Sequence, residues 1–365
     1  MYKYLFYDSI SLNRGAGGVL NVSDLLLRRM RMCKGDHIQP ISERHPGIYA
    51  AAQRLKISRF LLEIVLYNYH RLRALVSGET VFSLFPNYFL PFTLFGRHRD
   101  SIVVIHDLQY KAYPQYFSRT KRLWLDWCLR RVARSAADVV FISRSSQQDF
   151  ERYFGRCEHP TVIFNPVDAT RSPGPPGPVK PARAAAIGER YLIASYHYYP
   201  HKNFDGTLKL FERMKREGLV DWLDVTGNGA AEVKRMAAQM GPAISGCVRH
   251  RGLVSRKELS QLYCGAAAFI SLSAFEGFNL SAAEAATLGV PLLLSDIPVH
   301  RELFGDYAFF VGNGSSGLDG LSRYLAEHRS KQPAWPLAEA CAPGTVARRY
   351  LTLKHEAVSL AGAMQ

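Results

Sequence analysis

The stretch SAFEGFNLSAAEA, from Ser273 to Ala285, holds two glutamates, Glu276 and Glu284, beside a Gly-Phe turn. Two carboxylates can act as an acid and a base, bind the hydroxyls of a polar substrate, or serve the helix that carries them. Paired glycosidase carboxyls lie roughly 5–9.5 Å apart. A helix would separate these two by about 12 Å along its axis, so the spacing argues against paired acid and base work.

Ser281 and Glu284 fit S-x-x-E, the capping box of a helix start. In that interpretation Glu284 accepts a hydrogen bond from the amide of Ser281 and does no chemistry, and the spacing alone leaves this open. Glu276 has no such structural role, because it follows a predicted strand at 267–273, and ligands bind at strand carboxyl ends. A phosphate is favoured at the helix start, and Gly277 would let the chain approach it closely.

Two more side chains stand at the ends of predicted elements. Lys202, in PHKNFDGTL, lies at a helix start, where a cation is unfavourable unless an anionic ligand is present. The alternative is a solvated lysine. His106, in VVIHDL, follows an apolar strand, and on its own it fits a hydrogen-bonded core histidine better than a ligand.

Two glycine-rich loops follow predicted strands. NRGAGGVL contains Gly17 and Gly18, and VTGNGAAE contains Gly227. Neither matches the dinucleotide-binding fingerprint, because the glycine spacing is wrong and the downstream acidic partner is missing. As sequence motifs they indicate strand-to-helix turns of an α/β layer.

Positioning these residues requires strands, and the sequence offers two series of them. The first series of apolar runs lies at 3–11, 80–85, 101–108, 137–143 and 160–168. The second series lies at 190–196, 222–227, 247–252, 267–273 and 291–296. The second series alternates with helices predicted near 203–217, 230–240, 256–264 and 281–288. Continuous apolar strands that alternate with helices predict buried parallel sheets.

The boundary between the two series is rich in proline and glycine. We predict a first domain at 1–168, a linker at 169–187, and a second domain at 188–338. A last helix, within 339–365, can pack back on the first domain. The expected fold class is α/β, with two Rossmann-like parallel-sheet domains facing a cleft, because open α/β sheets bind ligands at the carboxyl ends of their strands.

The composition bounds the partners and the compartment. The net charge is +15, which favours an anionic partner such as a phosphorylated small molecule, an anionic membrane surface or a nucleic acid. The six cysteines show no metal-site or disulfide spacing, and we see neither a signal peptide nor 18 consecutive apolar residues. We therefore expect a cytoplasmic protein. The basic helix 118–135, with Trp124 and Trp127, is a candidate for peripheral docking on the inner face of the cytoplasmic membrane. The alternative is a packed helix with solvated arginines.

The stretch from Ser273 to Glu302, SAFEGFNLSAAEAATLGVPLLLSDIPVHRE, resembles the signature of the retaining, GT-B-fold glycosyltransferases of family four (glycosyl transferases group 1). Their motif reads E-x7-E, followed by G-V-P and S-D-x-P-x-x-x-E. Asn279 replaces the usual glycine, and asparagine tolerates unusual backbone angles. The resemblance covers nearly the whole chain and implies the GT-B fold.

The resemblance implies roles for the residues of the opening stretch. Glu276 would contact the donor sugar and Glu284 the ribose of the nucleotide. The chain from Gly277 through Phe278 and Asn279 to Leu280 would line the diphosphate site.

It also implies roles for the other candidates. Lys202 matches a lysine that contacts the diphosphate, and His201 stands where an arginine is commoner. His106 would line the donor-sugar site. The first glycine loop, with Gly17 and Gly18, would border the donor phosphate, and Gly227 would lie near the base.

The implied activity is retaining transfer of a hexose from a nucleotide-sugar, with GDP-mannose as the leading guess, to a glycan that is lipid-linked or an O-antigen intermediate. We expect front-face displacement, with no cofactor and no metal, because no D-x-D element follows a strand. The alternatives are a nucleotide-sugar epimerase or phosphorylase on the same fold, or a basic nucleic-acid binder. The last would need a recognisable nucleic-acid motif, and we find none.

Overall fold

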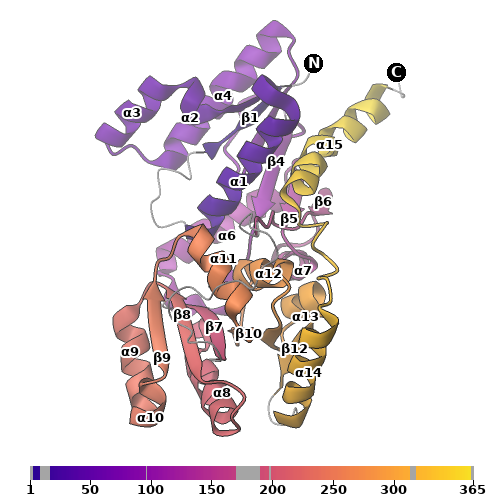
Figure 1. Cartoon of the computed structure of the whole chain (residues 1–365). Helices are drawn as coiled ribbons and strands as arrows, with labels where there is room; N and C mark the ends of the chain where they lie inside the picture. Colours follow the sequence, from indigo (N-terminus) through magenta and orange to yellow (C-terminus); the bar gives the residue numbers. More distant parts are fainter. Residues whose placement is uncertain are drawn as a thin grey trace. The chain divides into compact units, whose positions relative to one another are not determined.

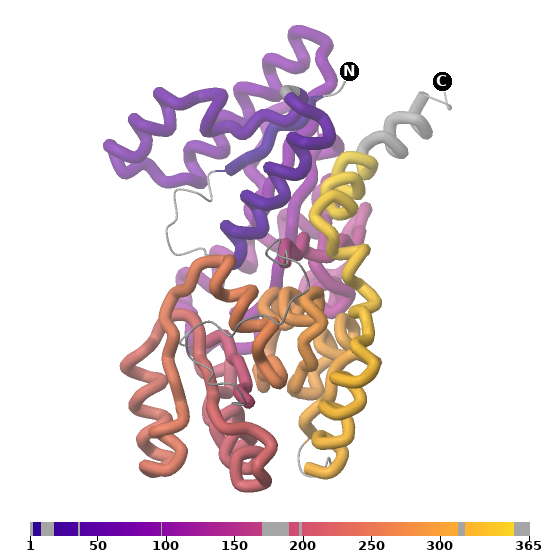
Figure 2. The backbone as a smooth tube through the Cα atoms, in the orientation of Figure 1, coloured from indigo at the N-terminus to yellow at the C-terminus, as the bar shows by residue number. Residues whose placement is uncertain are grey.

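The computed structural model describes residues 3–8, 17–95, 97–169, 190–196, 199–312 and 318–362. The predicted linker lies outside the described residues apart from Ala169, and so do the loop residues 13–16. The chain divides into two compact units: unit 1 comprises Met1–Pro166 and Glu339–Gln365, and unit 2 comprises Val167–Ala338. Figures 1 and 2 show the course of the chain through both.

Unit 1 is built on a six-stranded parallel sheet with the order β2-β1-β3-β4-β5-β6. Its strands are β1 (Lys3–Phe6), β2 (Ile38–Pro40), β3 (Val81–Phe85), β4 (Ser101–Ile105), β5 (Asp138–Phe141) and β6 (His159–Val162). Its α-helices are α1 (Gly17–Lys34), α2 (Ile41–Arg44), α3 (Pro46–Arg54), α4 (Arg59–Ser77), α5 (Gln109–Ala112), α6 (Arg119–Ala133), α7 (Arg144–Phe154) and α15 (Pro343–Gly362). Short 3₁₀ turns lie at η2 (Gly35–His37) and η3 (Pro114–Tyr116).

The central strands of unit 1, β3 and β4, are largely apolar and buried because helices cover both faces of the sheet. One face packs with α4, α6 and α7 through residues such as Leu66, Phe141 and Phe150. Full burial of one such side chain favours folding by about 1.5–3 kcal/mol. α15 lies beside α1 (Figure 1), and the Tyr4 hydroxyl donates to the Leu351 carbonyl (2.8 Å). The last helix therefore belongs to unit 1.

Unit 2 repeats the architecture with a parallel sheet of order β12-β11-β10-β7-β8-β9. Its strands are β7 (Tyr191–Tyr196), β8 (Trp222–Gly227), β9 (Val248–Gly252), β10 (Ala268–Ser271), β11 (Leu292–Ser295) and β12 (Ala308–Val311). Its helices are η4 (Pro200–Lys202), α8 (Phe204–Arg216), α9 (Ala230–Gln239), α10 (Pro242–Ser245), α11 (Arg256–Gly265), α12 (Leu280–Thr287), α13 (Pro298–Phe304) and α14 (Leu318–Lys331). The predicted fold class, two parallel-sheet α/β halves, is confirmed.

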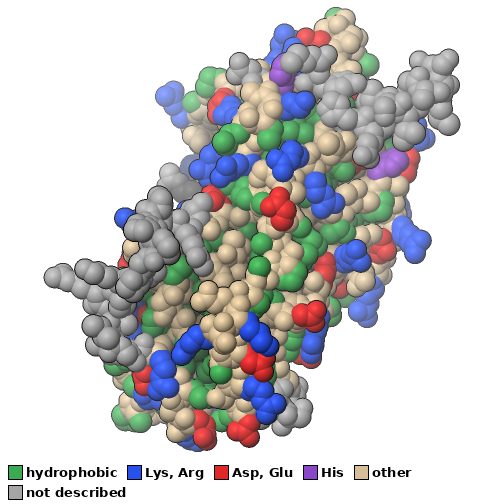
Figure 3. Space-filling view, turned by 45° about the vertical axis from the view of Figure 1, so that its right-hand side comes forward, with side chains coloured by type: hydrophobic (Ala, Val, Ile, Leu, Met, Phe, Trp, Pro, Cys, Tyr) green, Lys and Arg blue, Asp and Glu red, His purple; other side chains and the backbone are tan. Residues whose placement is uncertain are grey.

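Part of the positive charge is neutralised inside the fold. Asp224, buried on β8, accepts hydrogen bonds from Arg249 (2.6 Å) and Arg251 (2.8 Å) on the neighbouring edge strand β9. On the face shown in Figure 3, Lys and Arg side chains are scattered among acidic and apolar ones. Neither observation fits a basic stripe that follows a phosphate backbone.

Among the described residues, no helix is both long and apolar enough to span a lipid bilayer.

Candidate active site

The helix that carries Glu284 is capped by Asn279. Asn279 has φ +64° and ψ +67°, in the left-handed region, and its Oδ1 accepts a hydrogen bond from the amide of Ala282 (3.2 Å). Helix α12 therefore begins at Leu280, and Ser281 is its second residue. The capping-box interpretation of Ser281 and Glu284, which the spacing left open, is wrong, because a helix has one N-cap and Asn279 occupies that position.

The Asn279 side-chain amide also ties the helix start to strand β10 and to helix α13. Its Nδ2 donates to Ser271 Oγ (3.1 Å) at the end of β10 and contacts His300 Nε2 at 2.8 Å. His300 is fully buried on α13, and its Nδ1 lies 2.9 Å from the Ser295 carbonyl. A carbonyl only accepts, so Nδ1 carries the proton and Nε2 accepts from Asn279. Burial lowers the pKa of His300, which keeps this tautomer neutral.

Serine side chains hold the loop between β10 and α12. Ser295 Oγ donates to the Ser273 carbonyl, and the hydroxyls of Ser271 and Ser273 lie 3.2 Å apart. This loop contains Glu276, which stands three residues before the helix cap. Hydrogen bonds from β11 and α13 thus fix the backbone that presents Glu276 at the carboxyl end of the sheet.

Lys202 and Glu276 form an ion pair. Lys202 Nζ donates to Glu276 Oε1 at 2.6 Å, and the two side chains are 24% and 11% exposed. Burial alone would raise the pKa of Glu276, but the charge and the hydrogen bond of Lys202 outweigh it and hold the pKa below its usual value. Glu276 is therefore an ionised acceptor at neutral pH, able to receive hydrogen bonds from hydroxyl groups.

Lys202 reaches Glu276 because the turn after β7 is tied to the loop after β10. The Ala274 amide donates to the His201 carbonyl at 2.7 Å. His201 is buried, and its ring stacks on Tyr199 with centroids 5.5 Å apart. The following Asn203 is left-handed (φ +48°) and caps α8 through Oδ1 to the Gly206 amide (3.2 Å). Asn203 after Lys202 and Asn279 after Phe278 thus begin α8 and α12 in the same way, each as a left-handed N-cap.

Glu284 lies one turn inside α12 and has a different environment. Burial and, to a smaller extent, the charge of Asp168 raise its pKa to about 7 against the opposing effect of Arg256. Among the described residues its carboxylate has no hydrogen-bond partner, and neither do the amides of Leu280 and Ser281 at the helix start. Acceptors and donors with which no described residue pairs thus belong to the first turns of one helix, which suits a ligand that carries both hydroxyls and phosphate.

The packing of the turn after β8 explains why positions 227 and 229 are glycines. A Cβ at Gly227 would lie 2.3 Å from the Tyr196 carbonyl, and one at Gly229 would lie 3.3 Å from the Tyr196 ring. Both glycines have positive φ, +107° and +98°. Only glycine fits the close approach of this turn to β7, so the motif would be required here with or without a nucleotide base.

Unit 1 contains three of the predicted site residues, His106, Gly17 and Gly18. His106 follows β4, and its Nε2 donates to the Pro86 carbonyl at 3.0 Å. Burial lowers its pKa, so the ring is neutral and Nδ1 is left as an acceptor. Gly17 and Gly18 open α1, and space is free around Gly18 where a side chain would be. The loop before them lies outside the described residues.

Unit 2 thus brings most of the predicted residues together. Lys202 and Glu276 touch, and Glu284 follows on the helix that the same loop begins. The sequence arguments missed His300, Ser295 and Arg256. The contacts of His300 with Asn279 and of Ser295 with Ser273 join residues 21 and 22 positions apart, and the local signal was an asparagine immediately before each of two helices.

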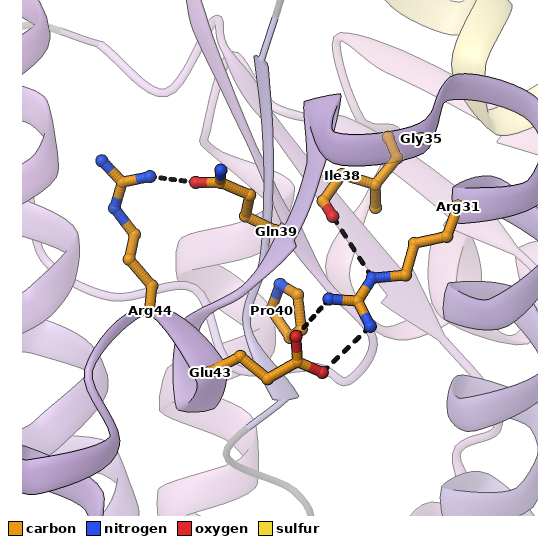
Figure 4. A pocket seen from close by; sticks show the side chains of 7 residues that line it. All are labelled: Arg31, Gly35, Ile38, Gln39, Pro40, Glu43 and Arg44. Atoms are coloured by element: carbon orange, nitrogen blue, oxygen red, sulfur yellow. Dashed lines mark hydrogen bonds and ion pairs between the residues drawn. The ribbon is translucent and has the colours of Figure 1, made fainter.

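Unit 1 also contains a hollow of about 630 Å³ beside β2. Polar side chains that line it pair with one another (Figure 4): both terminal nitrogens of Arg31 donate to Glu43, and Arg44 donates to the uncharged Gln39. The charges of Arg31 and Glu43 in this hollow are thus matched by each other, whereas the Glu284 carboxylate has no such partner among the described residues.

Two family models match this chain. Residues 180–327 match the family "Glycosyl transferases group 1", and residues 36–171 match "Glycosyltransferase Family 4". Together they span both units and include Lys202, Glu276 and Glu284.

The chain belongs to the group 1 glycosyltransferases.

Relatives of this group 1 glycosyltransferase have been named by what they transfer. It is 25% identical to O-antigen chain mannosyltransferase B of Escherichia coli over 252 residues, which are 66% of this chain and 63% of that protein. The chain therefore spans less than two thirds of the length of that curated relative.

Solved structures confirm the GT-B fold. Sucrose-phosphate synthase from Thermosynechococcus elongatus aligns over the whole of both chains with a TM-score of 0.62 and 13% identity. HepE of Anabaena, crystallised with UDP-glucose, aligns over 99% of each chain with a TM-score of 0.61 and 16% identity. At this identity the likeness concerns the fold alone.

Proposed function

We propose that this protein transfers a hexose from a nucleotide-sugar to a hydroxyl group of a glycan and retains the anomeric configuration. The proposed donor is GDP-mannose, and the proposed acceptor is a lipid-linked polysaccharide or O-antigen intermediate. Family membership and the mannosyltransferase named above support the reaction class. A donor of this kind combines a sugar, a diphosphate and a ribose, and the residues around α12 suit each part.

The observation that carries the proposal is the ion pair between Lys202 and Glu276. An ammonium group has three donors, so Lys202 can hold Glu276 with one and a diphosphate oxygen with another. Glu276, kept ionised by Lys202, accepts from the hydroxyls of the donor sugar. The pair thus sets the sugar and the leaving group at a fixed distance from each other.

In the proposed step, the bond between the sugar C1 and the diphosphate oxygen breaks while the acceptor oxygen bonds to C1 on the same face. The acceptor proton passes to the departing diphosphate, so charge and protons balance. Lys202 and the amides of Leu280 and Ser281 stabilise the negative charge that grows on the diphosphate. We propose that Glu284 accepts from the ribose hydroxyls and that His106 binds the donor sugar through Nδ1.

We further propose that the reaction needs no divalent cation, because Lys202 and the helix start supply positive charge at the diphosphate. Activity that persists in EDTA would support this, and activity restored only by added magnesium or manganese would contradict it. We also propose that the protein works in the cytoplasm, on the inner face of the membrane, where a lipid-linked acceptor is held.

The proposed function is tested by incubating the protein with labelled GDP-mannose and lipid-linked glycans extracted from membranes. We expect a product heavier by one hexose, with the donor's anomeric configuration by NMR. A parallel reaction with donor alone separates the rival class, since an epimerase changes the sugar without an acceptor. Conversion of the donor to another nucleotide-sugar under those conditions would reject glycosyl transfer.

A further inference from the structure

Helix α4 of unit 1 is apolar on the side that faces solvent. Its inner side buries Leu62, Leu66 and Tyr67 in the core. The opposite side carries large apolar side chains at helical spacing, all of them exposed: Leu61, Val65, Tyr69, Leu72, Leu75 and Val76. A helix that is apolar all round is normally buried, yet Leu75 and Val76 are 63% and 81% exposed.

The apolar surface continues beyond the helix. Asn68 of α4 holds a neighbouring loop, because its Nδ2 donates to the Phe92 carbonyl and its Oδ1 accepts from the Leu94 amide, both at 2.7 Å. The side chains of Phe92 and Leu94 are exposed, and Leu94 reaches 81%. Contiguous exposed apolar surface of this kind marks an interaction site.

Basic residues border this surface. Residues 44–99 contain eight Lys and Arg against two Glu, and one of these, Glu63, is buried. Arg54 and Lys56 stand exposed before the helix and alternate with the exposed Leu55 and Ile57, and Arg73 stands exposed in its last turns. Among the described residues, none of these three cations forms an ion pair.

We propose that α4 and the loop with Phe92 and Leu94 dock on an anionic lipid bilayer. An apolar helix face enters the boundary of headgroups and acyl chains while Lys and Arg meet the acidic headgroups. A second copy of the chain fits less well. A twofold interface sets the same patch against itself, which would bring unpaired cations together with no exposed carboxylate on α4 to match them.

This surface differs from the one that the tryptophans of 118–135 predict. On α6, Trp124 packs against Phe60 and Phe89, with ring centroids 5.3 and 5.8 Å away. Trp127 is 37% exposed and rests against Phe92. Trp124 therefore serves the packing of unit 1, and the exposed apolar surface is centred on α4.

The test is flotation of the full chain with vesicles of phosphatidylcholine containing phosphatidylglycerol, and with pure phosphatidylcholine, in the absence of any sugar donor. The wild type should float with the anionic vesicles and largely remain below with the neutral ones. Val65→Glu/Leu72→Glu should lower the bound fraction about tenfold. Leu253→Glu, at a leucine of unit 2 that is more exposed than either residue, is the control. Val65→Ser/Leu72→Ser, which adds no charge, is the milder variant.

Failure of the wild type to float, or equal flotation of Val65→Glu/Leu72→Glu, overturns the proposal. So does a wild-type dimer in light scattering that the same variant dissociates, since a second copy would then cover the surface. An unaltered thermal melt shows that each variant is folded. Because no donor is present, the outcome is independent of the proposed sugar transfer, and a protein that floats without transferring sugar would reject only the latter.

Discussion

Lys202 Nζ and Glu276 Oε1 lie 2.6 Å apart in unit 2, although 74 residues separate them in the chain. One follows β7 and the other follows β10, and these are neighbouring parallel strands. Parallel pairing puts their carboxyl ends at one edge of the sheet, and the hydrogen bond from Ala274 to the His201 carbonyl joins the two loops. The contact is therefore a product of topology.

Replacing Glu276 should abolish sugar transfer and leave the fold intact. We expect Glu276→Ala to lower kcat by at least about 100-fold, the loss typical of a removed transition-state contact. Glu258→Ala, at an exposed glutamate in the first turn of α11, is the matched control and should transfer normally. Near-normal turnover of Glu276→Ala, measured with labelled donor, would contradict the role given to this carboxylate.

Replacing Lys202 should move the pH dependence of activity. Lys202 holds the pKa of Glu276 low, so in Lys202→Met burial dominates and that pKa rises. The acid limb of the rate profile should therefore shift to higher pH. Stability should change in the matching sense: the ion pair stabilises the wild type above the unfolded pKa of about 4.3, and this contribution is lost as the pH falls through the lower folded pKa.

The same variant should cost about 1–3 kcal/mol of unfolding free energy at neutral pH, because it leaves a largely buried carboxylate without its partner. Urea titrations from neutral to acid pH measure this difference. Glu276→Gln/Lys202→Met should recover part of it, since the uncompensated charge is gone. A Lys202→Met profile that coincides with the wild type at every pH would mean that the two residues do not interact in solution.

Glu284 should release a proton when the nucleotide binds. Its pKa is raised to about 7 by burial, and hydroxyl donors from a ribose would favour the ionised form. Nucleotide affinity should therefore rise as the pH increases through 7, with protons released on binding. Calorimetry in buffers of different ionisation enthalpy measures that release, and Glu284→Gln should abolish it.

The effect of Glu284 on folding stability has the opposite pH dependence: stability falls as the pH rises, whereas nucleotide affinity increases. Because the folded pKa of Glu284 lies above the unfolded value, its ionisation progressively disfavours the folded state as the pH rises to about 7. Glu284→Gln should therefore bind nucleotide more weakly at pH 8 while melting no lower than the wild type. A variant that melts lower with unchanged affinity would assign Glu284 to the helix rather than to the ligand.

The cap at Asn279 separates backbone effects from side-chain effects. Asn279→Ala loses the bond to Ala282 and forces alanine to φ +64°, so we expect it to cost about 1–3 kcal/mol. Asn279→Gly can adopt the left-handed conformation without strain, so the loss of the cap should cost it less unfolding free energy. The rest of its loss should come from the missing hydrogen bond to His300. Urea unfolding measures the free energy of both variants. Equal losses of unfolding free energy would mean that the left-handed conformation carries no penalty for alanine.

Much of the fold follows from the sequence because its signals are local. Runs such as 101–108 and 190–196 are apolar without alternation, as strands covered on both faces must be, and both contain parallel strands of the structure. The strand predicted at 160–168 is shorter than expected, with β6 ending at Val162, and β2 and β12 were not predicted. All three strands lie at sheet edges, where the sequence pattern of burial is weaker.

The site could be predicted only in part. Glu276, Glu284 and Lys202 stand out by position, but their pairing depends on strand order, which no local pattern contains. The capping-box interpretation failed because S-x-x-E is compatible with several helix starts, and α12 uses Asn279 as its N-cap. That choice rests on Ser271 and His300, 8 residues before and 21 residues after the cap, and no local sequence pattern indicates these contacts.

The central claim is that the carboxyl edge of the unit 2 sheet binds a nucleotide-sugar through Lys202, Glu276 and Glu284. The most direct test is the melting temperature of the wild type and of Lys202→Met with GDP-, UDP- and dTDP-sugars, since a ligand that binds only the folded state raises it. We predict that GDP-mannose raises the melting temperature of the wild type and has a much smaller effect on Lys202→Met. Equal shifts in the two proteins, or no shift with any nucleotide-sugar, would contradict the claim.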